Sequence, residues 1–341
     1  MNTAMLDDVS LIALLVAMGL YAAAFIAFAL DLARRSALVA DAATAAARQP
    51  SAVGATAQRR GGTATLEREP GSSGRDRAAT GPDAPVAAGR SLSLNVAMVL
   101  LGVGFVAHAV ATVLRGLAAS RVPWANMYEF AMTGTLLILS VYLIVLTRRD
   151  LRFLGTFVTG LILILLGIAV VQYRVEVAPL PPSLQSYWLV IHVFVAALGT
   201  GFFALAFALS GVQLLQFRRE SLAADAKAAK MRFLATLPDS VTLESMAYRL
   251  NIVGFIFWTF TLMAGAVWAE RAWGRYWGWD TKEVWTFIIW VLYAGYIHAR
   301  ATRGWRGSRS AWLAIIGFSA VMFNFGVVNV FFKGLHTYSG L

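Results

Sequence analysis

The sequence of 341 residues contains no cysteine and only four histidines, and 14% of its residues are charged. The absence of cysteine excludes disulfides, thiolate metal sites and a cysteine nucleophile on this chain. Any thiol chemistry must therefore use thiols that another molecule brings. The scarcity of charge, together with 59% hydrophobic residues, excludes an ordinary soluble protein and predicts a polytopic membrane protein.

Long apolar runs recur along the chain, and each is long enough to cross a bilayer core of about 30 Å. Because acidic and basic residues are almost absent from them, these runs are typical of membrane-spanning helices. The sequence therefore predicts an all-α polytopic membrane protein with eight transmembrane helices, at 9–32, 92–115, 125–147, 153–173, 187–217, 249–269, 283–301 and 311–332.

The formal net charge of +11 is explained by arginines that gather in alternate loops. Arg34 and Arg35 follow the first span, and the loops after the third, fifth and seventh spans are also basic. Basic loops remain in the cytoplasm, so both termini and the other loops are expected outside, in the periplasm of a bacterial inner membrane. Lipid contact is therefore expected, and no nucleic-acid partner is needed to account for the charge.

The composition divides the chain into three parts. Residues 1–33 read as a first transmembrane anchor; a cleaved signal peptide is the alternative, but the N-terminus lacks the positive charge of a signal. Residues 34–91, rich in Ala, Gly, Arg, Ser and Pro, are predicted to be a disordered cytoplasmic linker. Residues 92–341 are predicted to form a seven-helix domain.

The stretch 268–290 carries six of the eleven tryptophans and lies between the sixth and seventh predicted spans, on the outer face. Its centre, 273–280, is too polar for hydrocarbon and too aromatic for an ordinary hydrophilic loop. One interpretation is a groove for a flat, apolar, partly anionic ligand, whose carboxylates Arg271 or Arg275 would pair. The other is an aromatic belt at the bilayer surface.

The run WGRYWGWD resembles the tryptophan-rich WWD signature of the haem-handling membrane proteins of cytochrome c maturation. The continuation DTKEVWTFIIWVLYAGYIH is similar to the CcsA (ResC-type) branch rather than to the CcmC or CcmF branches, although Thr281 replaces the usual proline. The resemblance implies that haem b, as cargo, contacts the WWD segment through Trp273, Gly274, Tyr276, Trp277, Trp279 and Asp280. Asp280 is also placed as an N-cap of the following helix, and the two roles remain open.

Two of the four histidines, His192 and His336, fall near the outer surface, at the level of the Trp-rich stretch. Two neutral imidazoles on either side of a flat ring are a common axial ligand pair for haem iron, and the pair needs no cysteine. A lone membrane histidine is otherwise a helix–helix hydrogen bonder. The resemblance implies that both ligate haem, because QSYWLVIH and GLHTYSG match the family's two periplasmic histidines.

The other two histidines are placed inside the membrane. The resemblance implies that His298, in YAGYIH, ligates the iron of a second haem there. Its second ligand is either His108, which lies in the outer half of its span, or a residue of a partner subunit. His108 is equally a candidate for a structural polar contact. Beyond it, Arg115 and Glu129 are predicted to form an ion pair.

The resemblance implies haem transport across the membrane and presentation to apocytochrome c carrying Cys-X-X-Cys-His. The chain would act within a cytochrome c synthetase complex with a CcsB (ResB-type) membrane subunit, without a complete active site of its own. The alternatives are a membrane transporter and a respiratory haem-b or quinone subunit, in which the Trp-rich loop is only an interfacial belt.

Overall fold

The computed structural model describes residues 2–48, 91–222, 232–302, 304–332 and 334–336. These residues form helices and loops, without a strand. The α-helices are α1 (Thr3–Arg48), α2 (Leu92–Ala119), α3 (Met127–Leu146), α4 (Gly155–Gln172), α5 (Tyr187–Glu220), α7 (Ser240–Trp273), α8 (Thr281–Thr302), α9 (Ser308–Phe323) and α10 (Asn329–Phe331). Short 3₁₀ turns lie at Arg152–Leu154, Pro182–Leu184 and Arg232–Thr236, and a π-helical turn at Asn324–Val328 joins α9 to α10.

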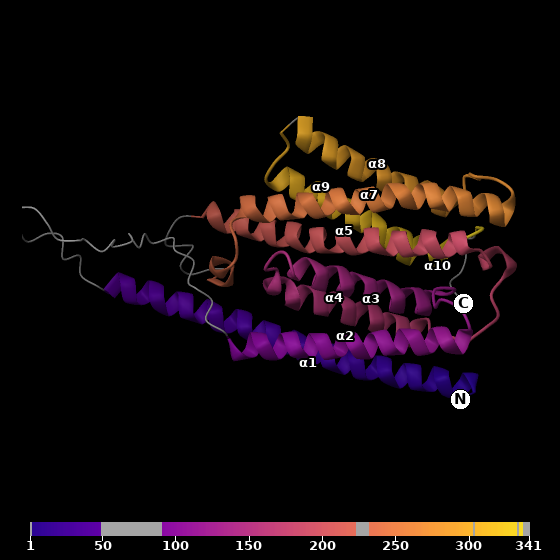
Figure 1. Cartoon of the computed structure of the whole chain (residues 1–341). Coiled ribbons are helices and arrows are strands. Elements are labelled where there is room, and N and C mark those ends of the chain that lie inside the picture. The colour runs from indigo at the N-terminus through magenta and orange to yellow at the C-terminus, as the bar shows by residue number, and fades with distance from the viewer. Residues whose placement is uncertain (1, 49–90, 223–231, 303, 333, 337–341) are drawn as a thin grey trace, which may run out of the picture.

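The helices lie side by side along one common direction (Figure 1). Helix α1 packs against α2 and α4, α3 against α4 and α5, and α5 against α7 and α9, while α8 packs on α7 and α9. The bundle therefore extends from the α1–α2 pair on one side to the α8–α9 pair on the other.

Seven helices in the described ranges are long and apolar enough to cross a membrane. They are α1, α2, α3, α5 and α7, together with α4 preceded by its 3₁₀ turn and α9 continued through α10. The remaining helix, α8, corresponds to the seventh predicted span, 283–301; it is less apolar because it carries tryptophans, tyrosines and a histidine, yet it runs alongside α7 and α9 (Figure 1). The prediction of an all-helical polytopic membrane protein is confirmed.

Helix α1 is longer than the sequence suggested. It continues to Arg48, so residues 34–48 of the predicted disordered linker are helical. Alanine dominates this part, and alanine has the highest helix propensity, which lets the helix run on past the apolar segment. The remainder of the predicted linker, 49–90, lies outside the described residues.

Close helix packing in the second half of the bundle depends on small residues. A Cβ on Gly199 of α5 would lie 3.3 Å from the Gly254 carbonyl oxygen of α7, and a Cβ on Gly254 would lie 2.7 Å from the ring of Phe203. Helices in membranes associate through such small-residue contacts because lipid gives no hydrophobic drive for association. The pair α5–α7 forms the wall on which the site below is built.

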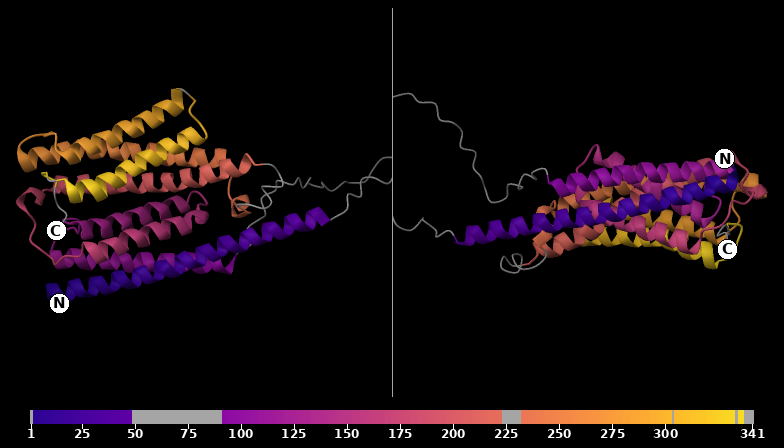
Figure 2. Two further views of the ribbon diagram at one scale, coloured as in Figure 1. Left: turned by 180° about the vertical axis from the view of Figure 1, so that it is seen from behind. Right: turned by 90° about the horizontal axis from the view of Figure 1, so that it is seen from below.

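The two ends of the bundle differ in charge. The start of α1, the α7–α8 loop and α10 lie at one end, here called the tryptophan end (Figures 1 and 2). Arginines are more numerous at the opposite end, where the described residues include Arg34, Arg35, Arg148, Arg149, Arg152, Arg218, Arg219, Arg300, Arg306 and Arg309. This asymmetry is the one that a positive-inside topology requires.

A buried charge cluster ties the first helices together at the tryptophan end. Arg115 Nε donates to Glu129 at 3.0 Å with both side chains fully buried, which confirms the predicted ion pair. Arg115 also pairs with Asp7 of α1 at 2.5 Å, and Arg121 pairs with Glu129 at 2.6 Å. Because every charge has an opposite partner, the cluster is stable as a unit and sensitive to the loss of one member.

Candidate functional site

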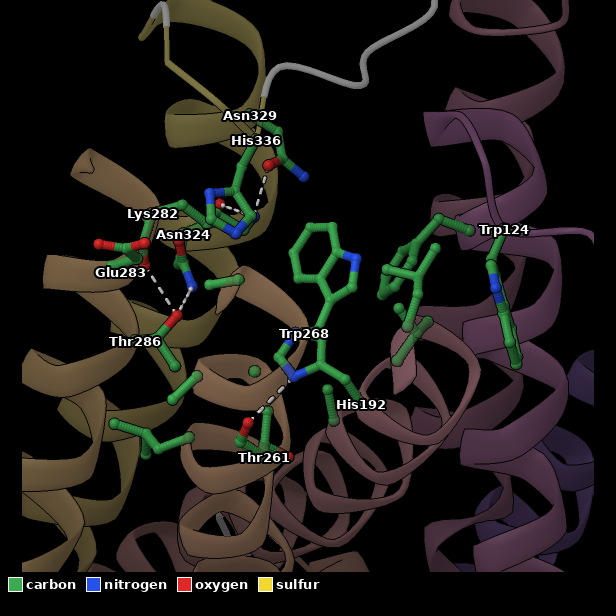
Figure 3. A pocket seen from close by; sticks show the side chains of 18 of the residues that line it. Trp124, His192, Thr261, Trp268, Lys282, Glu283, Thr286, Asn324, Asn329 and His336 are labelled. Carbon is green, nitrogen blue, oxygen red and sulfur yellow. Dashed lines mark hydrogen bonds between the residues drawn. The ribbon is translucent and has the colours of Figure 1, made fainter. Parts of the chain in front are cut away.

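A cavity of about 150 Å³ lies at the tryptophan end, between α5, α7, α8 and the π-helical turn after α9. Its wall is mostly apolar and aromatic, with a few polar side chains, as in sites for flat organic ligands. Figure 3 labels the lining residues Trp124, His192, Thr261, Trp268, Lys282, Glu283, Thr286, Asn324, Asn329 and His336.

His192 enters the cavity from the second turn of α5, whose first turn is capped by the Ser186 side chain. Its Nδ1 lies 2.9 Å from the main-chain carbonyl oxygen of Thr261 on α7. A carbonyl only accepts, so Nδ1 carries the proton and Nε2 keeps a free lone pair. Gly265 makes this approach possible, because a Cβ there would lie 2.7 Å from the imidazole Cε1.

His336, beyond α10, reaches the same cavity from another part of the chain. Its Nδ1 donates to Asp280 Oδ2 at 2.7 Å, which again leaves Nε2 free. This hydrogen bond holds the pKa of the Asp280 carboxyl below its usual value. Asp280 Oδ1 also accepts from the Leu335 N–H at 3.1 Å, so one carboxylate fixes both the segment and its imidazole.

Asp280 has the capping role that the sequence suggested and also holds His336, while its predicted contact with haem stays a prediction. Its Oδ2 accepts weakly from the Lys282 N–H at 3.3 Å, as an N-terminal helix cap does. The shorter contact is to His336. A carboxylate behind a ligating imidazole fixes its tautomer and orientation and raises its basicity.

Trp268, in the last turns of α7, contacts both histidines. Its ring stacks on His192 at 5.8 Å between centroids and meets His336 edge-on at 5.3 Å. Its Nε1–H donates to the Ser183 carbonyl oxygen at 3.0 Å, which fixes the indole. Trp273 completes the cluster, at 4.8 Å from Trp268 and 4.9 Å from His336.

The loop between α7 and α8 is held by a glycine at the end of α7 and by the Glu283 carboxylate at the start of α8. Gly274, with φ of 70°, ends α7 in the left-handed conformation that glycine adopts without strain. Glu283 Oε2 accepts from the N–H groups of Gly278 at 2.8 Å and Asp280 at 3.1 Å. The Trp-rich loop is therefore hydrogen-bonded to the first turn of α8.

The predicted contacts of the Trp-rich segment divide into two groups. Tyr276 and Trp277 line the cavity. Trp273 supports His336, Gly274 ends the helix, and Trp279 is 78% exposed with φ of 58°. A tryptophan held outward in the left-handed region presents its ring to another molecule or to lipid.

The two arginines expected to pair ligand carboxylates do not line the cavity. Arg271 is exposed and lies 3.5 Å from its neighbour Glu270. The Arg275 guanidinium packs over Gly278, where a Cβ would lie 2.3 Å from Cζ. The cation that does line the cavity is Lys282.

The two membrane histidines lie apart from this site and from each other. His298 is exposed on α8, about 27 Å along the helix from Asp280. His108 of α2 is fully buried, where its Nε2 lies 3.0 Å from the Met132 carbonyl oxygen and its Nδ1 lies 3.3 Å from the Tyr21 hydroxyl. These contacts fit the structural alternative for His108; a haem-ligating role for either residue stays a prediction.

Four further residues shape the cavity and were not singled out from the sequence as site residues: Gly265, Trp268, Thr261 and Lys282. Trp268 and Lys282 lie within the Trp-rich stretch, but their direction depends on how α7 and α8 pack. Gly265 and Thr261 could not be found from the sequence. Thr261 contributes a main-chain carbonyl and Gly265 the absence of a Cβ, and both matter only because the fold places them beside His192.

Comparison with known proteins gives a consistent assignment. Residues 124–336 match the family described as "Cytochrome C assembly protein", a range that begins before α3 and ends at His336. The chain is 36% identical over 245 residues to the cytochrome c biogenesis protein CcsA of Guillardia theta, covering 67% of this chain and 80% of the relative.

Two more relatives agree. The CcsA protein of Heterosigma akashiwo is 33% identical over 249 residues, covering 64% of this chain and 77% of the relative. That of Prochlorococcus marinus is 30% identical over 271 residues, covering 73% and 86%.

A solved structure, the cytochrome c haem lyase CcmF, shares the fold with a TM-score of 0.60 at 14% identity. The alignment covers 95% of this chain and 47% of that structure, so this chain corresponds to about half of CcmF. The family match, which covers more than half of the chain, and the identity to CcsA proteins agree with the resemblance of the Trp-rich segment. The chain belongs to the cytochrome c assembly protein family, as a CcsA-type member acting in cytochrome c biogenesis.

Proposed function

We propose that this protein binds haem b as cargo in the cavity at the tryptophan end and presents it to apocytochrome c. The observation that carries the proposal is the matched pair of imidazoles. His192 and His336 each have Nδ1 bound to a fixed acceptor, each keep Nε2 free, and both contact Trp268. Two imidazoles with free Nε2 and an aromatic wall are the groups that hold a flat iron macrocycle.

The two histidines differ in the group that accepts the hydrogen bond from Nδ1. His192 donates to a neutral carbonyl, whereas His336 donates to the Asp280 carboxylate. A carboxylate makes the imidazole the stronger donor to a metal and favours the ferric state of iron bound to it. The chain's own contribution is therefore to fix the ligand geometry and to set the redox balance of the cargo.

The thioether bonds form between the cargo and the client protein. Each Cys-X-X-Cys-His thiol adds across a vinyl group of haem, sulfur to one carbon and hydrogen to the other, so no external oxidant is consumed. This chain has no cysteine and supplies position rather than a nucleophile. The exposed rings of Tyr276, Trp279 and Tyr187 at the same end give a surface for apocytochrome c and for a CcsB-type partner subunit.

The charge asymmetry of the bundle supports transport of haem from the cytoplasmic side, at the basic end, to the outer side, at the tryptophan end. The basic end is placed in the cytoplasm and the tryptophan end in the periplasm of a bacterial inner membrane, with both termini outside. His298, at the basic end of α8, is exposed where haem would enter from the cytoplasmic side. The second ligand at that position is assigned to the partner subunit, since His108 lies in α2 with both ring nitrogens occupied.

The proposal is tested by co-expressing the chain with a CcsB-type partner and an apocytochrome c, and measuring haem that stays on the cytochrome polypeptide after denaturation. His192→Gly and His336→Gly are expected to reduce attachment at least tenfold, and added imidazole is expected to restore part of it. Wild-type attachment by both variants, or loss that imidazole never restores in either, would contradict ligation by these residues.

His298→Gly separates transport from presentation. We expect this variant to lose attachment when haem comes from the cytoplasm, yet to bind haem added to the purified protein with the wild-type spectrum. A changed outer-site spectrum in His298→Gly would contradict two separate positions. If the wild-type protein never acquires haem with its partner present, the proposed function is contradicted, and the alternative interpretation of the Trp-rich loop as an aromatic belt at the bilayer surface is favoured.

A further inference from the structure

Lys282, in the first turn of α8, is the one lysine or arginine in the described wall of the cavity. Figure 3 places Lys282 beside His336 and Asn324, on the α8 side of the cavity. The surrounding wall is mostly aromatic and apolar, with Trp277, Phe325 and Trp268 among its members, and Glu283 is the one acid in its described part. A cation in such a wall is costly unless it meets an opposite charge, in the protein or in a ligand.

Two neutral oxygens fix the position of this ammonium. Lys282 Nζ donates to the Asn324 carbonyl oxygen at 2.9 Å and to Asn329 Oδ1 at 2.5 Å. It also lies 5.0 Å from the centroid of the Phe325 ring. An ammonium has three N–H donors, so two are held by the π-helical turn and α10, and the third is available to the cavity.

No carboxylate among the described residues lies within 4.0 Å of this nitrogen. The two nearest acids in sequence are engaged elsewhere. Asp280 accepts from His336, Leu335 and the Lys282 main chain, and Glu283 accepts from the α7–α8 loop. The charge of Lys282 therefore has no direct ionic partner within the described protein.

Asn324 adds a second polar group at the same place. Its side chain is 2% exposed and lines the cavity, and its Oδ1 has no hydrogen-bond partner, while Nδ2 makes one long contact of 3.5 Å with Thr286. A half-turn of the amide about its last side-chain bond exchanges oxygen and nitrogen, so Asn324 can turn an N–H donor toward a ligand in the cavity. The π-helical turn that begins at Asn324 is a feature frequently found at functional sites.

We propose that Lys282, with Asn324 beside it, binds a carboxylate of the cavity ligand. This inference rests on the proposed function, in which that ligand is haem, and the carboxylate is then one of its propionates. The propionate edge points toward α8 and the π-helical turn. Because Lys282 is two residues from Asp280, which holds His336, the same loop fixes both the iron ligand and the in-plane rotation of the macrocycle.

The test compares two probes that differ only in their carboxylates, iron protoporphyrin IX and its dimethyl ester. Each is titrated into the purified full-length chain, into Lys282→Met and into Lys282→Arg, and the dissociation constants are read from the absorption change. Wild type is expected to prefer the free acid by about 10- to 100-fold, the range of a charged hydrogen bond. Lys282→Met is expected to lose most of this preference by weakening acid binding alone, while Lys282→Arg retains part of it.

Arg271→Met is the matched control, since it removes an exposed cation at the same end. It is expected to keep the wild-type preference. A wild-type preference below twofold overturns the inference whatever the variants do, as does a Lys282→Met preference equal to that of wild type. Unchanged ester binding by Lys282→Met shows that the variant is folded. A wild-type protein that gives no low-spin spectrum with either probe instead contradicts the proposed function, so the two failures are distinct.

Discussion

Replacing Gly265 by alanine should displace the His192 imidazole although His192 itself is not substituted. The added Cβ would lie 2.7 Å from Cε1 and 2.9 Å from Nδ1 of the imidazole, closer than real contacts of this kind. The ring must then move away from α7, which breaks its 2.9 Å hydrogen bond to the Thr261 carbonyl and disturbs its stacking on Trp268.

The magnitude follows from these contacts. The lost hydrogen bond costs about 1 kcal/mol, and the forced shift adds about 1–3 kcal/mol if the bundle resists it. Loss of support behind a ligating histidine typically weakens metal binding by about 10- to 100-fold. Gly265→Ala is therefore expected to bind haem at least tenfold more weakly than wild type and to gain a high-spin fraction.

Gly295→Ala on α8 is the matched control, because a Cβ at that position meets nothing within 4 Å. It should leave haem binding unchanged and stabilise the helix by roughly 0.5–1 kcal/mol. Haem titration and thermal unfolding of both variants in the same detergent give the comparison. Equal haem affinity and equal spin state in the two variants would refute the assignment of His192 to the site.

Three further substitutions test other parts of the structure. Asp280→Asn removes the charge behind His336 and should weaken haem binding about tenfold and raise its midpoint potential, measured by spectroelectrochemistry; an unmoved potential would contradict the coupling. Glu129→Gln removes the buried carboxylate that Arg115 and Arg121 share, leaving Asp7 alone opposite the two cations, and should destabilise the protein by about 3–5 kcal/mol in thermal unfolding, so a wild-type melting curve would count against the cluster. At the basic end, the buried Glu244 accepts from Arg300 Nε at 3.1 Å and from the Gly307 N–H at 2.8 Å; Glu244→Gln should cost about 1–3 kcal/mol of stability while the haem spectrum stays unchanged, and a spectral change would show coupling between the two ends.

The overall architecture was predictable because hydropathy determines which segments can cross a bilayer. The span predicted at 187–217 corresponds to α5, Tyr187–Glu220, and that at 125–147 to α3, Met127–Leu146. The end of α1 was misplaced, since an alanine-rich segment carries no apolar signal yet favours a helix. The start of α7 at Ser240, ahead of the predicted 249, was missed for a different reason, because its first turns are polar and begin at the Asp239 cap.

The sequence predicted which end of the bundle each site residue lies at, because the order of the membrane spans determines this. Counting spans places His192, His336 and the Trp-rich loop at one end, and the structure brings both histidines to one indole. The partner of each Nδ1 was not predictable, because it depends on how α5 meets α7 and how the chain after α10 returns to Asp280. That Lys282 rather than Arg271 or Arg275 lines the cavity was likewise not predictable, since side-chain direction at Lys282 is set by tertiary packing.

The most direct test is the electron paramagnetic resonance spectrum of ferric haem bound to the purified chain and to His192→Gly and His336→Gly, each with and without imidazole. Wild type should give the low-spin signal of two imidazole ligands. Each single variant should turn high-spin and return to low-spin when imidazole is added. A low-spin signal that survives in either variant without imidazole would show that the residue is not a ligand and would contradict the central claim.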